Sequence, residues 1–211
     1  TSRRFPKPRM SRGLEVHPHT GGEDMEIWVD PRYVNAGYGW AFPADQELRV
    51  GVGSFDPRDH IRKPTDRLAD DVEVDKVRYQ GNWIPHKLRP AAEDGVFFVG
   101  DSAGHCLPLT AEGIRTALYF GLACGRELRA VLAGVEEIET ALGRYGAFSD
   151  SHGWQFSWLL SAQWAVSATT RMPLLTEVIK AVGKPAVTRA VFNHYLAIAP
   201  PEYVARDALL A

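Results

Sequence analysis

The chain has 211 residues, 45% of them hydrophobic, and a formal net charge of −2. This length suffices for one large or two small domains, and the balanced charge excludes the basic surface of a nucleic-acid-binding protein. Its two cysteines, Cys106 and Cys124, exclude a disulfide framework and favour a reducing, cytoplasmic compartment. The sequence has no uninterrupted apolar run of membrane-spanning length.

Residues 1–85 have the pattern of an antiparallel sheet. Large aromatic residues alternate with small ones, which predicts a strand with Tyr38, Trp40 and Phe42 on one face. The predicted strands are residues 26–30, 38–42, 48–53 and 76–79, with a turn at 43–47 and a short, mobile helix and loop within 57–75.

The most informative segment begins with four apolar residues, 96–99, followed by Gly100 and Asp101. This pattern predicts a strand that is buried on both faces and followed by a carboxylate. Open α/β sheets bind their ligands at such carboxyl ends of strands. A loop containing Pro108 then leads into a predicted helix whose first turn carries Thr110, Glu112 and Gly113. The amide groups at such a helix start favour an anionic ligand.

The C-terminal part of the chain is predicted to be helical. An apolar stripe continues the first helix to residue 132, and two further helices are expected at 174–182 and from Pro185 to just before Pro200. The tryptophan-rich segment 154–164 has three interpretations: a roof over a lipid-sized cavity, a peripheral contact with a membrane surface, or an ordinary core helix.

The sequence Gly-Asp-Ser-Ala-Gly at residues 100–104 and Pro-Leu-Thr-Ala-Glu-Gly-Ile at 108–114 resemble a flavin motif of the FAD-dependent geranylgeranyl reductases. This family is a branch of the p-hydroxybenzoate hydroxylase-like flavoproteins. The resemblance implies that Asp101 accepts a hydrogen bond from the ribityl chain, and that the amides of Gly113 and Ile114 face the pyrimidine edge of the flavin. The implied FAD-binding residues are Gly100, Asp101, Pro108, Thr110, Gly113 and Ile114.

Two positions depart from the flavin motif of the reductases. Ser102 replaces the usual alanine, a mild change, and Ala111 replaces a glycine, which narrows the space beside the ring. Gly104 stands where the aromatic hydroxylases more often have histidine, and His105 follows it. This difference favours the reductase branch.

The aromatic hairpin also resembles the reductases, through their Tyr-x-Trp-x-Phe-Pro substrate motif and the Val-Gly-x-Gly strand after it. The implied substrate-binding residues are Tyr38, Trp40, Phe42 and Pro43. An aromatic wall suits a polyprenyl chain because it buries hydrocarbon without leaving polar atoms unsatisfied. The alternative is that these aromatics are only the core of a sheet.

A complete member of the family would also have a Gly-x-Gly-x-x-Gly turn after a strand, which binds the FAD diphosphate. No such segment occurs here. Gly51 and Gly53 precede Pro57, and the segment before this proline is unfavourable for the start of a helix. We therefore expect this chain to be the C-terminal part of a longer protein, with an N-terminal dinucleotide-binding segment as its partner. By itself the chain should bind FAD weakly or not at all.

Two residues of the flavin loop, His105 and Cys106, are candidates for acid–base or redox chemistry, with ordinary packing as the default. His17 and His19 lie near Glu15, Glu23 and Asp24, but further ligands at zinc-like spacing are not evident. We expect a surface loop there and no metal site.

The predicted fold class is α/β, as an α+β fragment: the C-terminal part of a Rossmann-like flavin domain, an antiparallel substrate sheet and C-terminal helices. The expected domains are residues 1–85, 86–132 and 133–211. The expected function is FAD-dependent reduction of alkene bonds in a prenyl or similar hydrophobic substrate, with NAD(P)H or another electron donor. The alternatives are an FAD-dependent monooxygenase and a non-catalytic lipid-binding module with a degenerate flavin fold.

Overall fold

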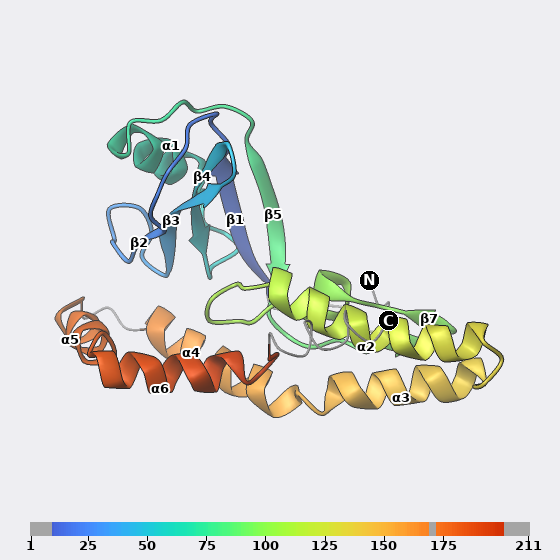
Figure 1. The fold of residues 1–211 in the computed structure, drawn as a ribbon. Helices are drawn as coiled ribbons and strands as arrows, with labels where there is room; N and C mark the ends of the chain where they lie inside the picture. The colour runs from blue at the N-terminus through green and yellow to red at the C-terminus, as the bar shows by residue number, and fades with distance from the viewer. Residues whose placement is uncertain (1–9, 169–171, 201–211) are drawn as a thin grey trace. The chain divides into compact units, whose positions relative to one another are not determined.

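The computed structural model describes residues 10–168 and 172–200, and Figure 1 shows their helices and strands. The chain forms two compact units, which we describe separately. The sheet unit consists mainly of Met10–Ile84, and the helical unit consists mainly of the described residues from Pro85 onward. Whether residues 86–132 and 133–211 are separate domains stays a prediction.

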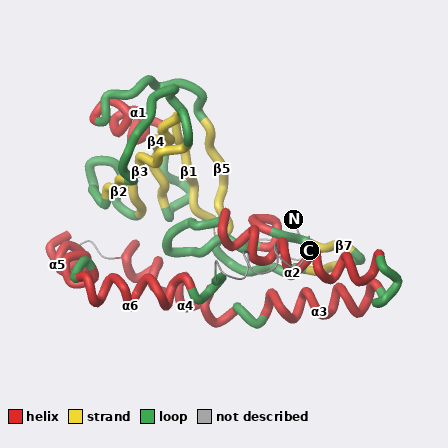
Figure 2. The backbone as a smooth tube through the Cα atoms, in the orientation of Figure 1, coloured by secondary structure: helices red, strands yellow, loops and turns green. Residues whose placement is uncertain are grey.

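The sheet unit contains a five-stranded sheet in the order β2-β3-β4-β1-β5. The neighbouring pairs β2 and β3, β3 and β4, and β4 and β1 are antiparallel. Figure 2 shows these strands in yellow, with the helix α1 in red. The elements are β1 (Met10–Val16), β2 (Glu26–Trp28), β3 (Gly37–Ala44), β4 (Glu47–Ser54), α1 (Arg62–Asp71) and β5 (Gln80–Pro85).

Strands β3 and β4 form the predicted aromatic hairpin. Trp40 pairs with Gly51, and a two-residue turn at Asp45 and Gln46 joins the strands. Asp45 has a φ of 58°, which a short aspartate side chain tolerates at a tight turn. Directly paired residues share a face, so Tyr38 and Trp40 lie on the same face as the glycines of β4 with which they pair.

Helix α1 covers the other face of the sheet. Val50 and Val52 are fully buried on that face, as is Leu68 of α1. The close approach requires Gly39, because a Cβ atom there would lie 2.8 Å from Leu68 Cδ2. The short helix predicted within residues 57–75 is therefore confirmed, and it packs against the sheet.

One strand prediction in this unit was wrong, and the strand β1 was missed. The strand expected at residues 76–79 is absent, because Arg78 has a φ of 49° and leaves the extended region. The chain instead becomes extended at β5, and β1 was not predicted at all. In β1 the apolar residues Met10, Leu14 and Val16 occupy alternate positions, but Arg12 interrupts the alternation that marks a half-buried strand.

The helical unit contains five α-helices among its described residues, together with a two-stranded hairpin and one turn of 3-10 helix. The elements are β6 (Ala92–Glu93), β7 (Val96–Phe97), η1 (Gly100–Ala103), α2 (Ile114–Leu132), α3 (Ile138–Asp150), α4 (Gly153–Ala168), α5 (Met172–Val182) and α6 (Pro185–Leu196). The predicted C-terminal helices are confirmed, with α5 beginning two residues earlier than expected.

The strand predicted at residues 96–99 is much shorter than expected. Only β7 is a strand, its partner β6 is antiparallel, and Val96 is 49% exposed. A strand buried on both faces needs neighbouring strands and covering layers, which the described residues of this unit do not supply. The mixed α/β class is confirmed, whereas the Rossmann-like arrangement stays a prediction.

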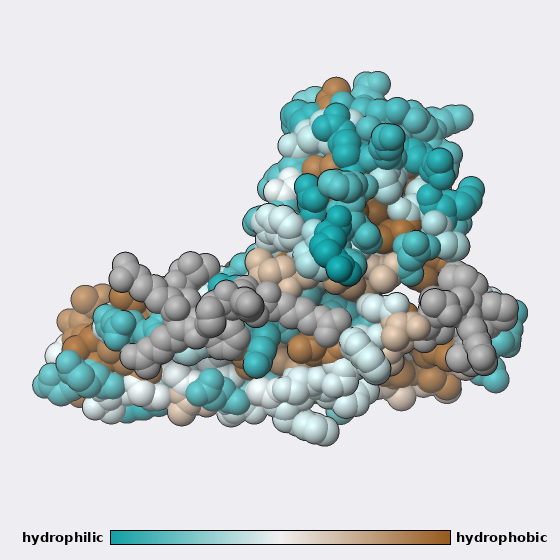
Figure 3. Space-filling model, turned by 180° about the vertical axis from the view of Figure 1, so that it is seen from behind, coloured by the Kyte–Doolittle hydropathy of each residue, from teal (hydrophilic) through white to brown (hydrophobic). Residues whose placement is uncertain are grey.

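Helix α4 packs one side into the core and exposes tryptophans on another. Phe156 and Leu159 are buried, whereas Trp154, Trp158 and Trp164 are at least half exposed. Figure 3 shows hydrophobic surface on the helical unit, whereas the visible face of the sheet unit is mostly hydrophilic. Over residues 10–168 and 172–200, none of the helices combines the length and apolar character needed to span a bilayer. A peripheral membrane contact stays a prediction.

Candidate functional site

The Gly-Asp motif forms a tight turn around η1. The amide of Gly104 donates to the carbonyl of Asp101 at 3.1 Å, and Gly104 has a φ of 71°. A Cβ atom on Gly104 would lie 2.0 Å from the carbonyl oxygen of Lys87. Backbone geometry thus demands glycine at this position, and a histidine there would require the chain to move.

The turn brings Asp101 next to the start of helix α2. Its Oδ1 atom lies 3.6 Å from the position that a Cβ atom would take on Gly113, the N-cap residue of α2. No side chain caps this helix start. An acceptor carboxylate and the positive end of a helix therefore lie side by side, as a ligand with both donor and acceptor groups would require.

The Asp101 side chain keeps access to solvent while protein atoms surround part of it. Burial raises the pKa of the Asp101 carboxyl above its ordinary value, and the positive charge of Arg89 opposes this rise. A carboxylate in this setting gains from a donor brought by a ligand.

The loop between the turn and α2 is closed by its own backbone. The amide of Leu107 donates to the carbonyl of Glu112 at 2.9 Å, and the amide of Ala111 donates to that of Leu107 at 2.8 Å. Ala111 has a φ of 53°, a conformation that favours glycine. This is the position where the family motif has glycine, so the loop keeps its shape despite the substitution.

The remaining predicted FAD-binding residues lie in different environments. Pro108 is buried, and its carbonyl accepts a hydrogen bond from the Gln163 side chain of α4. The Thr110 hydroxyl lies 2.5 Å from that of Tyr195, whereas the side chain of Ile114 is 77% exposed. The structure thus brings Asp101 to the start of α2, and it ties the loop before α2 to later helices.

The two catalytic candidates are buried next to this loop. His105 stacks on Phe120, with ring centroids 3.8 Å apart, and its Nε2 lies 2.9 Å from the Ser149 hydroxyl. Burial, together with a smaller effect of the His152 charge, lowers the pKa of His105 to about 3, so the ring is neutral at pH 7. Burial also raises the pKa of the Cys106 thiol. These environments favour packing over acid–base chemistry for both residues.

The predicted substrate residues form an aromatic wall on the sheet unit, which we define as Tyr38, Trp40 and Phe42. Ring centroids of Tyr38 and Trp40 are 5.8 Å apart, and those of Trp40 and Phe42 are 6.3 Å apart. A Cβ atom on Gly51 would lie 2.4 Å from Trp40 Cζ2. The glycine strand therefore provides the space in which the indole lies against the sheet.

Glu15 anchors this wall, a role that was not predicted from the sequence. The indole N–H of Trp40 donates to Glu15 Oε2 at 3.1 Å, and the His17 Nε2 atom lies 2.7 Å from Glu15 Oε1. His17 was predicted to lie in a surface loop, but it is buried and follows β1 directly. The available signal was the two-residue spacing of Glu15 and His17, which places both side chains on one face of an extended chain.

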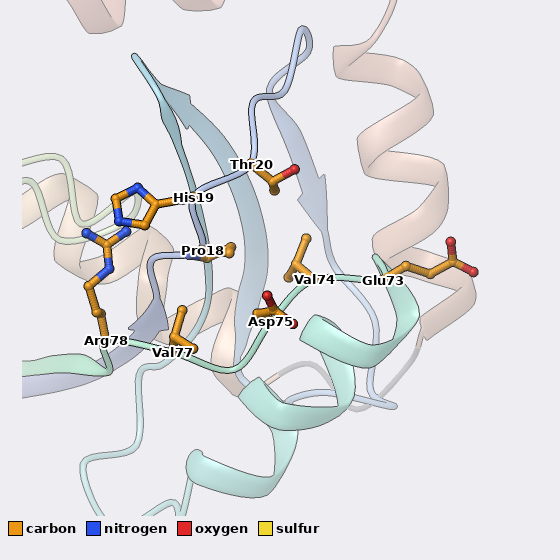
Figure 4. A pocket seen from close by; sticks show the side chains of 8 residues that line it. All are labelled: Pro18, His19, Thr20, Glu73, Val74, Asp75, Val77 and Arg78. Carbon is orange, nitrogen blue, oxygen red and sulfur yellow. The ribbon is translucent and has the colours of Figure 1, made fainter.

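A separate hollow of about 500 Å³ lies within the sheet unit (Figure 4). Its lining residues are Pro18, His19, Thr20, Glu73, Val74, Asp75, Val77 and Arg78. None of the predicted cofactor or substrate residues lines it, so we do not assign the proposed chemistry to this hollow. In the parts of the chain that the structure describes, no group of three or more His, Cys, Asp or Glu residues is arranged to hold a metal ion.

Comparison with solved structures finds proteins of related fold. A geranylgeranyl bacteriochlorophyll reductase-like protein from Thermoplasma acidophilum matches 97% of this chain with a TM-score of 0.72 and 16% identity, over 55% of its own length. An anhydrotetracycline hydroxylase from Streptomyces rimosus matches 88% of the chain with a TM-score of 0.53 and 20% identity, over 40% of its own length. The chain has a fold found in flavoprotein reductases and hydroxylases.

Sequence comparison finds relatives among the geranylgeranyl reductases. A chloroplastic geranylgeranyl diphosphate reductase from Oryza sativa subsp. japonica is 34% identical over 140 residues, 63% of this chain and 30% of the relative. A geranylgeranyl diphosphate reductase from Rhodobacter capsulatus is 29% identical over 143 residues, 65% of this chain and 36% of the relative. A digeranylgeranylglycerophospholipid reductase from Methanosphaera stadtmanae is 29% identical over 125 residues, 55% of this chain and 32% of the relative.

These matches confirm the resemblance to the FAD-dependent geranylgeranyl reductases that the sequence motifs indicate. No protein-family model matches the chain. The chain spans about a third of the length of these curated relatives.

Proposed function

We propose that this chain provides part of the FAD site and the substrate-facing wall of an oxidoreductase that reduces alkene bonds in a prenyl or similar hydrophobic compound. The observation that carries the proposal is the convergence of the Asp101 carboxylate and the uncapped start of α2 at Gly113. The family relationship supports a flavin as the ligand there, within the C-terminal part of a Rossmann-like domain.

The donors and acceptors present fit the pyrimidine and ribityl parts of a flavin. Asp101 would accept a hydrogen bond from a ribityl hydroxyl, and the amides at the start of α2 would face the pyrimidine edge. Gly113 leaves open the space beside Asp101 that a methyl group would fill. The positive end of α2 favours the negative charge that the ring gains on two-electron reduction. When bound, FAD would supply the hydride, with NAD(P)H or another donor as the electron source.

The aromatic wall would hold the substrate. Aromatic rings bury hydrocarbon at about 25 cal/mol per Å² without presenting unsatisfied polar atoms. The only polar group of Trp40, its indole N–H, is already satisfied by Glu15 at 3.1 Å. The wall therefore offers an apolar surface suited to a prenyl chain.

The first test is the visible spectrum of the natural full-length protein. We expect a yellow protein whose absorbance bleaches on reduction. The isolated chain should bind FAD weakly or not at all, because no diphosphate-binding glycine turn occurs in its sequence. A colourless full-length protein that still binds prenyl lipid would support the non-catalytic lipid-binding alternative.

The second test separates reductase from monooxygenase, an alternative kept because a hydroxylase shares the fold. The full-length protein would be incubated anaerobically with a chemical reductant and a geranylgeranyl lipid, and the product analysed by mass spectrometry. We expect two hydrogen atoms to be added per reduced double bond. A product formed only with oxygen, and heavier by one oxygen atom, would contradict the reductase proposal.

A further inference from the structure

A group of three residues ties the C-terminal end of α6 to the loop before α2. Glu112 accepts hydrogen bonds from Arg115 Nε at 2.6 Å and from Arg115 Nη2 at 2.8 Å. The hydroxyl of Tyr195 donates to the same carboxylate. We call Glu112, Arg115 and Tyr195 the clamp.

The clamp also satisfies backbone groups at the end of α6. Arg115 Nη1 donates to the carbonyl of Leu196 at 3.2 Å and to the carbonyl of Ala199. The last carbonyls of a helix have no partner within it, so a cation at this end stabilises α6. One guanidinium therefore joins the loop and the helix end.

The charges of the clamp are balanced. Burial opposes ionisation of Glu112, but the hydrogen bonds from Arg115 and Tyr195 outweigh this effect and lower the pKa of the Glu112 carboxyl. The carboxylate stands just before the start of α2, where an unpaired negative charge would repel a ligand that becomes anionic. Pairing with Arg115 removes much of this repulsion.

We propose that Arg115 and Tyr195 are positioning residues for the flavin site, through which α6 fixes the loop 107–113 and neutralises Glu112 beside the start of α2. This inference rests on the proposed function for its flavin part. Its mechanical part, the fixing of the loop, rests only on the hydrogen bonds of the clamp. The two parts can therefore be tested separately.

The mechanical test compares Tyr195→Phe with wild type in the full-length protein without added ligand. The variant keeps the ring and loses the hydroxyl that contacts Glu112 and Thr110. We expect faster amide hydrogen exchange in residues 107–113, by about tenfold, because hydrogen bonds to a charged group are the stronger kind. Unchanged exchange would overturn the proposal, whatever the protein binds.

The matched control is Tyr79→Phe in the sheet unit. The Tyr79 hydroxyl donates to Asp66 at 2.6 Å, and the Arg62 guanidinium lies 3.4 Å from the centroid of the Tyr79 ring. This site therefore has the same combination of tyrosine, carboxylate and arginine as the clamp. We expect this control to leave exchange in residues 107–113 unchanged. Faster exchange there in the control as well would show a general loss of stability and would overturn the assignment to the clamp.

The flavin test measures FAD affinity and reduction potential. Tyr195→Phe should weaken FAD binding by about tenfold. Arg115→Gln should shift the potential to a more negative value, and the double variant Glu112→Gln, Arg115→Gln should restore it. Wild-type affinity and potential in the single variants would overturn the flavin part. If wild type binds no FAD, the proposed function fails and the flavin part fails with it, while the exchange result still decides the mechanical part.

Discussion

Asp101 Oδ1 lies 3.6 Å from the point where a Cβ atom would stand on Gly113, an ordinary van der Waals distance. An alanine at this position would therefore fit the fold, yet it would place a methyl group between the carboxylate and the helix start. Two residues twelve positions apart in sequence thus define the narrow space that the proposed function assigns to a flavin edge.

Gly113→Ala should leave stability nearly unchanged and weaken FAD binding to the full-length protein at least tenfold, because the methyl group occupies the ligand space. Affinity would be measured by flavin fluorescence and stability by urea denaturation. Gly125→Ala, in the same helix with open space around its Cβ position, is the control and should bind FAD normally. Wild-type affinity in Gly113→Ala would contradict the proposed site.

Gly104→Ala should destabilise the fold strongly. Its Cβ atom would lie 2.0 Å from the Lys87 carbonyl oxygen, and its φ is 71°. The combined steric and conformational cost should be roughly 3 kcal/mol or more. Gly95→Ala is the control, because Gly95 has a φ of 78° with nothing near its Cβ position. It should lose only about 1 kcal/mol in the same denaturation experiment, and equal losses for both variants would contradict the steric explanation.

His105 should make stability depend on pH. Its pKa is about 3 in the folded protein, against an ordinary value of 6.5, so the unfolded chain gains a proton below pH 6.5 that the folded chain does not. The resulting contribution of His105 to the free energy of unfolding is fully present above pH 6.5. It is lost as the pH falls toward 3, at up to about 1.4 kcal/mol per pH unit. Burial lowers the pKa of His152 as well, which acts in the same direction.

Between pH 6.5 and 5, wild type should therefore lose about 2 kcal/mol more stability than His105→Gln. The measurement is the free energy of unfolding at each pH, and only the slope matters, because the variant also loses the stack on Phe120. The control is a substitution of the exposed His60 by glutamine, which should keep the wild-type slope. Equal slopes for wild type and His105→Gln would show that His105 is not held neutral.

Glu15→Ala should weaken the aromatic wall. It removes the acceptor of the Trp40 indole and the partner of the buried His17. Leaving these groups without their partner should cost about 2 kcal/mol of stability. The prenyl lipid should also bind less tightly, since Trp40 is no longer fixed. Glu26→Ala, at an exposed position of β2, is the control for stability and lipid binding. A stable variant with normal lipid affinity would contradict the anchoring role.

Local patterns were enough to predict the aromatic hairpin. Alternation of large and small residues determined the face of Tyr38, Trp40 and Phe42, because side chains alternate along any strand. Proline and glycine likewise marked the bounds of α5 and α6 closely. The strand at residues 96–99 was predicted incorrectly, since an apolar run indicates burial without showing which neighbours supply it.

By itself, the sequence determined the resemblance to the geranylgeranyl reductases and the helical C-terminal part, because these depend on short motifs and on periodicity. Only the tertiary structure decided that Glu15 holds Trp40, that His105 is buried against Phe120, and that Tyr195 reaches Glu112 from 83 residues away. Such contacts join elements distant in sequence. Their distances and desolvation depend on how the elements pack, a property that local sequence patterns do not encode.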